Sequence, residues 1–137
     1  MRAVLDPNVL VSSVLSAVGA PAQVLARWRS GDFELVASEL VIAELERAHR
    51  YPKVEKLLEP QDAISLVALV REHAHFAADP PAAQRSRDPD DDYLIALAEA
   101  ERAVVVSGDR HLLELADDVP VLSPRAFLNA LEEEIRT

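Results

Sequence analysis

The sequence predicts an α/β fold, a three-layer α/β/α sandwich around a short central parallel sheet. Two patterns in the 137-residue chain predict it: short apolar runs alternate with longer segments of helical periodicity, and the runs are apolar on both faces. Strands of that kind need helices above and below them. Half of the residues are hydrophobic, so one domain over residues 1–137 is expected to bury its own core.

Five short runs are the expected strands. The first run ends at Asp6, and the run that precedes Ser107 is β-branched, as buried strands often are. Parallel strands need long connections between them, and the segments that separate the runs are long enough to be helices. The expected strands cover residues 2–5, 33–36, 75–78, 103–106 and 121–122.

The connecting segments carry helix signals. Pro21 and Pro60 suit the first turns of helices. Ser38 and Asp88 suit N-caps, and Pro52 is expected to end the helix that Ser38 begins. The expected helices cover residues 8–16, 21–29, 39–50, 60 onward, 89–101, 109–115 and 124–134, with a loop over 79–87.

Composition excludes several kinds of chemistry. The chain has no cysteine, which rules out a disulfide scaffold, a thiolate metal site and a thiol nucleophile, and suits a reducing cytoplasm as the expected compartment. The net charge is -10, from 24 acidic and 14 basic residues. Because affinity for phosphate rests on Lys and Arg, such a chain is a poor general nucleic-acid binder unless part of its acid excess belongs to a metal site.

The segment 7–26 contains no charged residue. Neither a membrane span nor a signal peptide is expected there, because Asp6 precedes the apolar run and Gly19 and Pro21 interrupt it. Two buried helices are expected instead. Their surplus apolar area makes residues 9–26 a candidate surface for a dimer or a protein partner.

Acidic residues stand where the predicted strands end. Asp6 directly follows the first strand, and Asp109 follows the fourth. Glu44 lies one to two turns into the helix after the second strand. In parallel sheets, sites form at the carboxyl ends of strands, so these carboxylates are expected to converge at one edge. Further acids begin the helix that leads into the fourth strand: Asp88, Asp90, Asp91 and Asp92.

Converging carboxylates repel one another, and divalent cations remove that penalty. All-oxygen ligand sets suit Mg²⁺ or Mn²⁺, and two such ions roughly 4 Å apart can activate water and stabilise the departing oxygen in phosphodiester cleavage. Taken singly, Asp6 and Asp109 are equally well explained as helix caps, and Glu44 as a solvated residue. Their joint arrangement favours a metal site.

The chain resembles the PIN-domain ribonucleases in four ordered stretches: VLDPNVLVSSVL, SELVIAELERA, RDPDDDYLIALAEA and VVVSGDRHLLEL. The similarity runs over about residues 2–115 and is closest to the bacterial, VapC-like toxins of toxin–antitoxin systems. It implies a PIN-like sandwich and an endoribonuclease that depends on Mg²⁺ or Mn²⁺. It also implies RNA as substrate and a protein antitoxin as partner. A homodimer is expected from the apolar area of residues 9–26.

The resemblance assigns roles to individual residues. It makes Asp6, Glu44 and Asp109 three of four catalytic acids, with Asn8 and Ser107 as supporting polar residues. For the remaining acid, Asp91 lies above an apolar helix stripe that should face the sheet, whereas Asp92 lies nearer the solvent side. The family pattern also fits Asp91, so Asp91 is preferred and Asp92 is the alternative. The expected metal ligands are Asp6, Asp91, Asp109 and Asp92.

Other residues near the acids carry weaker expectations. The family usually has Thr or Ser where Pro7 stands, and proline removes a hydroxyl and a backbone donor. Trp28 and Tyr51 are expected to pack in the core or an interface rather than to stack on bases. The candidates for contacting phosphate flank the acids in sequence: Arg85, Arg87 and Arg110.

Three alternative functions stay open. The first is a catalytically weak PIN fold that only binds RNA or protein, which Pro7 favours because it lacks the hydroxyl of the usual Thr or Ser. A phosphate-accepting receiver domain fits the size and acidity, but receivers place a lysine after a late strand and this chain has none beyond Lys56. A phosphatase of the haloacid dehalogenase type needs a second acid where Asn8 stands.

Overall fold

The computed structural model of the chain describes residues 1–82 and 91–136. A five-stranded sheet forms its centre, and every pair of neighbouring strands is parallel. The strand order is β3-β2-β1-β4-β5, so the chain builds outward from β1 in one direction and from β4 in the other. The strands are β1 (Arg2–Leu5), β2 (Glu34–Ala37), β3 (His75–Phe76), β4 (Val104–Val106) and β5 (Val121–Leu122).

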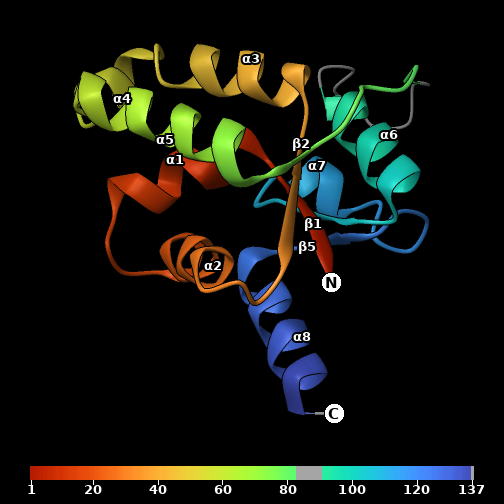
Figure 1. Cartoon of the computed structure of the whole chain (residues 1–137). Helices are drawn as coiled ribbons and strands as arrows, with labels where there is room; N and C mark the ends of the chain where they lie inside the picture. Colours follow the sequence, from red (N-terminus) through yellow and green to blue (C-terminus); the bar gives the residue numbers. More distant parts are fainter. Residues whose placement is uncertain (83–90, 137) are drawn as a thin grey trace.

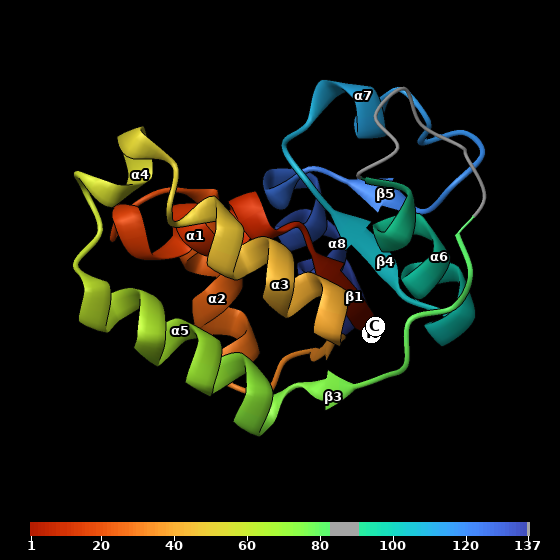
Figure 2. The same ribbon diagram turned by 90° about the horizontal axis from the view of Figure 1, so that it is seen from above.

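Helices cover the sheet from two sides (Figures 1 and 2). Seen from above, the group α1, α2, α3 and α5 lies on one side, and α6 packs against β1 and β4 on the other. The expected α/β/α layering is confirmed. The helices in the described residues are α1 (Pro7–Leu15), α2 (Ala20–Arg29), α3 (Glu39–Ala48), α4 (Pro52–Glu55), α5 (Pro60–His73), α6 (Asp92–Glu101), α7 (Arg110–Leu113) and α8 (Pro124–Arg136).

The predicted elements form with small shifts at their ends. The second strand begins at Glu34 because its pairing with β1 begins there, opposite Arg2. Pro52 was expected only to end a helix, and the short helix α4 that begins at Pro52 was missed. Proline suits this first helical position because no hydrogen bond is required of its nitrogen. The expected cap Asp88 lies outside the described residues.

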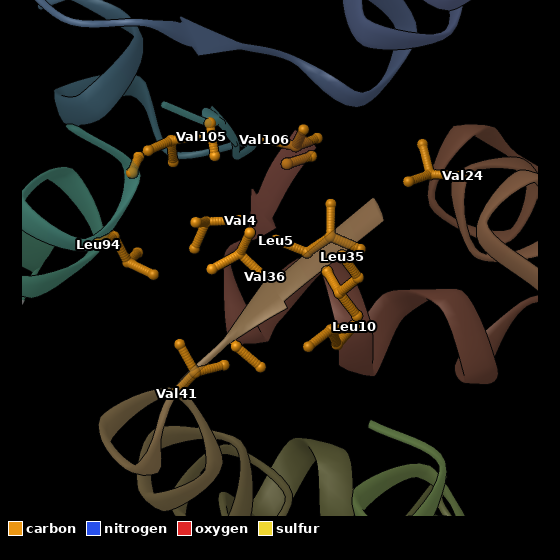
Figure 3. Close-up of a cluster of buried hydrophobic side chains, with 14 of the residues drawn as sticks. Val4, Leu5, Leu10, Val24, Leu35, Val36, Val41, Leu94, Val105 and Val106 are labelled. Atoms are coloured by element: carbon orange, nitrogen blue, oxygen red, sulfur yellow. The ribbon is translucent and has the colours of Figure 1, made fainter. Parts of the chain in front are cut away.

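The core lies on both faces of the sheet, as the apolar runs predicted. Val4 and Leu5 point to opposite sides of β1, and both are buried. Leu94 of α6 and Leu10 of α1 are also buried, and they belong to the cluster around these strands (Figure 3). Each such side chain contributes about 1.5–3 kcal/mol by leaving water. This packing holds the ends of β1 and β4 in place.

The uncharged segment forms α1 and α2, and Gly19 makes the turn between them with a φ of +108°, which favours glycine. Most of the apolar side chains of α1 are buried inside the protein, whereas Val18 is 79% exposed. No single helix in the described ranges is long and apolar enough to cross a membrane. Only α1 and α2 together reach that length and composition, and they are bent by 97°.

Candidate active site

The carboxyl ends of β1 and β4 lie side by side. Leu5 pairs with Val106, and the backbone N–H of Asp6 donates to the carbonyl of Val106 at 2.9 Å. The residues that follow the two strands, Asp6 and Ser107, are therefore neighbours. The strand order reverses direction between these two strands, and α/β sheets bind their ligands at such a reversal.

A chain of hydrogen bonds links the polar residues at this edge. One oxygen of the buried Asp6 carboxylate accepts from the backbone N–H of Asn8 at 2.9 Å, and the other accepts from the Ser107 hydroxyl at 2.7 Å. The same hydroxyl oxygen accepts from the backbone N–H of Asp109 at 3.0 Å. The Asp109 carboxylate in turn accepts from the N–H of His111 at 2.8 Å. Asp6 and Asp109 therefore cap α1 and α7 while standing at the edge of the sheet.

Four acidic side chains from separate parts of the chain share one cavity of about 150 Å³. Asp6 follows β1, Glu44 lies on α3, Asp91 immediately precedes α6, and Asp109 follows β4. Asp92, the first residue of α6, is buried, so the expectation that it lies nearer the solvent side is wrong. It does not line the cavity, whereas Asp91 does. Among the residues that the structure describes, the lining is Asp6, Pro7, Asn8, Glu44, Arg47, Ala48, Tyr51, Asp91, Tyr93 and Asp109.

The environment of Asp6 disfavours its negative charge. Burial raises the pKa of Asp6, hydrogen bonds from Asn8 and Ser107 lower it, and the charge of Asp109 raises it. The net pKa lies above the ordinary value for an aspartic acid. A cation beside Asp6 and Asp109 would reverse the part of this shift that repulsion causes.

Tyr93 of α6 also lines the cavity, and the acids affect its ionisation. Burial raises the pKa of its phenol first, and the charges of Asp6, Glu44 and Asp91 raise it further. The phenol therefore stays protonated and neutral at physiological pH. The charge of Asp79, which does not line the cavity, raises this pKa as well.

The donor set fits a hard divalent cation in its chemistry, because the acids offer only carboxylate oxygens. In residues 1–82 and 91–136, however, no three Asp, Glu or His side chains stand close enough to hold one ion together. Three of the described side chains could hold one ion together only after they move closer to one another. Each Asp6 oxygen accepts one hydrogen bond and keeps a second lone pair for such an ion.

The supporting residues take distinct places. Asn8 is exposed and lines the cavity, whereas Ser107 is fully buried and donates its hydroxyl to Asp6. Pro7 occupies the first position of α1, where its missing N–H leaves no hydrogen bond unmade. Arg110 is exposed and lies outside the lining. Arg85 and Arg87 lie outside the described residues.

Four residues of the cavity lining were not predicted from the sequence: Arg47, Ala48, Tyr51 and Tyr93. Arg47 lines the cavity and its guanidinium lies 3.0 Å from the Glu44 carboxylate. Tyr93 lies on α6 just after the acids. Tyr51 was expected in the core or an interface, and the core assignment is wrong, because Tyr51 is 51% exposed and lines the cavity. The sequence did contain a signal for two of them. Arg47 and Tyr51 lie three and seven residues after Glu44, a spacing that places residues on one face of a helix.

A family model for the PIN domain matches residues 2–111. The chain therefore belongs to the PIN-domain family, which is a family of nucleases. Among curated proteins it is similar to the uncharacterized protein MJ1680 of Methanocaldococcus jannaschii. The two are 23% identical over an alignment of 153 positions, which covers 98% of this chain and 94% of that protein. The family assignment leaves the receiver and dehalogenase alternatives without support.

Solved structures share the fold at low sequence identity. VapBC2 from Rickettsia felis, bound to a DNA fragment from its promoter, has a TM-score of 0.61 and 13% identity, covering 90% of this chain and 98% of that chain. VapBC-1 from nontypeable Haemophilus influenzae has a TM-score of 0.60 and 16% identity, covering 91% and 99%. A domain of a functionally unknown Methanocaldococcus jannaschii protein has a TM-score of 0.56 and 14% identity, covering 89% of each chain.

Proposed function

We propose that this protein is a metal-dependent endoribonuclease and the toxin of a toxin–antitoxin pair. The observation that carries the proposal is the shared cavity, to which four separate parts of the chain each contribute one carboxylate. Membership of a nuclease family supports it. The VapBC structures of the same fold, each named for a toxin–antitoxin pair, support the toxin role.

In this proposal Asp6, Glu44, Asp91 and Asp109 are the catalytic acids. Bound Mg²⁺ or Mn²⁺ supplies activation of water and stabilisation of the departing oxygen in phosphodiester hydrolysis. Asp6, Asp91 and Asp109 hold the metal, with Asp92 as the alternative ligand.

The surrounding residues orient these acids. Ser107 and the backbone N–H of Asn8 fix both oxygens of Asp6, so that its free lone pairs keep one direction. The Ser107 hydroxyl also holds the backbone of Asp109, which ties the positions of the two acids together. The neutral phenol of Tyr93 adds no further negative charge to the cavity.

The partners follow from the same role. RNA is the substrate, and a protein antitoxin covers the cavity or its entrance. The protein acts as a homodimer in the cytoplasm, where cellular RNA is available. The exposed turn at Val18, between α1 and α2, belongs to the 9–26 surface that is the candidate for these protein contacts.

Cleavage of RNA with Mn²⁺ or Mg²⁺, with and without a chelator, tests the proposal. We expect metal-dependent cleavage that Asp6→Asn abolishes and Asp117→Asn retains. Asp117 is a matched control because it is an exposed aspartate that does not line the cavity. Cleavage by purified Asp6→Asn at the wild-type rate, or cleavage insensitive to the chelator, would refute the proposal.

A PIN fold with weak or no catalysis is the second candidate function. Pro7 favours it, because it lines the cavity and brings no hydroxyl to a position where the family usually has one. The same experiment separates the two. Binding of RNA without cleavage at any metal concentration would leave the second candidate.

A further inference from the structure

A second and larger cavity lies at the opposite end of the sheet from the acids. It has a volume of about 840 Å³, and its walls are the start of β1, the segment from the end of α2 into β2, and α5. We call it the amino-end cavity. Arg2 lines it and begins β1, whereas Asp6 follows the same strand about 13 Å further along. Among the described residues, the linings of the two cavities share no member.

Part of the amino-end cavity is apolar and fixed in shape. Trp28 and Phe33 belong to the buried core and line the cavity, and the half-buried Leu69 joins them from α5. The turn after α2 is held by the N–H of Gly31, which donates to the carbonyl of Trp28 at 2.9 Å. The cavity is therefore largely formed before any ligand binds, and its volume lies within the range of about 300–1,000 Å³ that is typical of small-molecule sites.

The acidic side chains of this lining already have partners. The Asp32 carboxylate pairs with the guanidinium of Arg27, and the Glu34 carboxylate lies 2.7 Å from the guanidinium of Arg2. Neither acid is therefore available to hold a cationic ligand. His73, which lines the cavity from α5, is exposed and carries a charge only when it is protonated.

Arg29 is the cation of this lining whose charge is not balanced. It is the last residue of α2 and is exposed, and its side chain forms no hydrogen bond or ion pair with any residue that the structure describes. A guanidinium can bind one carboxylate through two parallel hydrogen bonds. Arg29 therefore offers a place for one negative group at a cavity that is otherwise neutral or apolar.

Nearby acids limit how much negative charge a ligand can carry. Three glutamates that pair with Arg2, Arg27 and the amino terminus lie just outside the lining: Glu101, Glu132 and Glu134. Like charges repel, so these carboxylates disfavour a ligand with several negative groups. One negative group beside Arg29 is the charge that the surroundings accept.

We propose that the amino-end cavity binds a small organic monocarboxylate, whose carboxylate contacts Arg29 and whose apolar body packs against Trp28, Phe33 and Leu69. Burial of the apolar body supplies the affinity, and the guanidinium selects the negative head group. The inference does not depend on the proposed ribonuclease activity, because the acids of the other cavity take no part in it.

The fluorescence of Trp28 tests the inference at the site itself, because Trp28 is the only tryptophan in the chain and lines the cavity. The wild-type protein is titrated with octanoate, and the change in Trp28 emission is expected to saturate. Octanamide has the same apolar body without the charge, and suberate has a second carboxylate at the other end. Both should bind about fivefold more weakly than octanoate, the size expected for gain or loss of one partly exposed charge interaction.

Substitution of Arg29 tests the contact with the head group. Arg29→Gln should weaken octanoate binding about fivefold and leave the affinity for octanamide unchanged. Arg29→Lys keeps the charge and should recover most of the affinity. The matched control is Arg125→Gln, which removes an exposed arginine outside the lining and should bind octanoate like the wild type. Excess Mn²⁺ should leave the octanoate affinity unchanged, because the two cavities are separate.

A Trp28 signal that never saturates with octanoate, or equal octanoate affinities in Arg29→Gln and the wild type, would overturn the inference. Binding of suberate or phenyl phosphate more tightly than octanoate would overturn the assignment to a monocarboxylate, because both carry more negative charge. Saturable octanoate binding in a protein that cuts no RNA would support this inference while the proposed ribonuclease activity fails.

Discussion

Removal of the Ser107 hydroxyl tests whether one buried side chain holds two of the acids. In Ser107→Ala, the Asp6 carboxylate loses the hydrogen bond at 2.7 Å and the Asp109 N–H loses its acceptor at 3.0 Å. A hydrogen bond to a charged group contributes about 1.5–3 kcal/mol and a neutral one about 0.5–1.5 kcal/mol. Because Ser107 is fully buried, water cannot replace either bond in place. We expect the free energy of unfolding to fall by about 2–4 kcal/mol.

Thermal unfolding measures this loss as a decrease in Tm of about 6–15 °C for a chain of this length. Ser107→Thr keeps the hydroxyl and should recover most of the loss. Ser65→Ala removes an exposed hydroxyl and should change stability by less than about 0.5 kcal/mol. A change of that small size in Ser107→Ala would refute the reasoning. The variant should also raise the pKa of Asp6 further, because it loses a hydrogen bond that lowers it.

Three further predictions concern the charges of the cavity. Because the pKa of Asp6 is raised, the folded protein binds a proton at Asp6 more readily than the unfolded chain does. Ionised Asp6 therefore lowers the free energy of unfolding at neutral pH, and this loss disappears as the pH falls and Asp6 becomes protonated. Asp6→Asn should therefore have a higher Tm than the wild type at neutral pH, with a difference that shrinks towards about pH 4; a constant difference would contradict this. Mn²⁺ at about 100 times its Kd should stabilise the wild type by about 2.7 kcal/mol, seen as a higher Tm, and an equal rise in Asp109→Asn would exclude Asp109 as a ligand. Arg47→Gln should change stability by less than about 1 kcal/mol in chemical denaturation, because its ion pair with Glu44 is largely exposed; a larger loss would show that the pair is structural.

Local patterns determined the elements of this fold. Apolar runs on both faces predicted the strands and the two helical layers, because burial of such runs requires cover on each side. Ser38 was predicted as an N-cap, and its hydroxyl accepts from the N–H of Val41 at 3.3 Å. The short helix at Pro52 was missed because a proline can either end the preceding helix or occupy the first position of a new one.

The acids of the cavity could be named from the chain because strand ends fix where their backbones lie. Asp6 and Asp109 follow neighbouring parallel strands, so sheet pairing alone brings them to one edge. Their roles in catalysis stay predictions. Glu44 needed in addition the placement of its helix beside that edge, which the resemblance to the family supplied.

Only the tertiary structure decided which side chains face the cavity. The choice between Asp91 and Asp92 depends on how α6 is rotated against the sheet, and the exposure of Tyr51 depends on the turn that carries α3 into α4. The spacing of residues along one element favoured Asp91 but did not fix this rotation or the direction of the turn. The rotation and the turn result from packing between elements that are distant in sequence. The same packing brings the Ser107 hydroxyl within hydrogen-bond distance of both the Asp6 carboxylate and the Asp109 N–H.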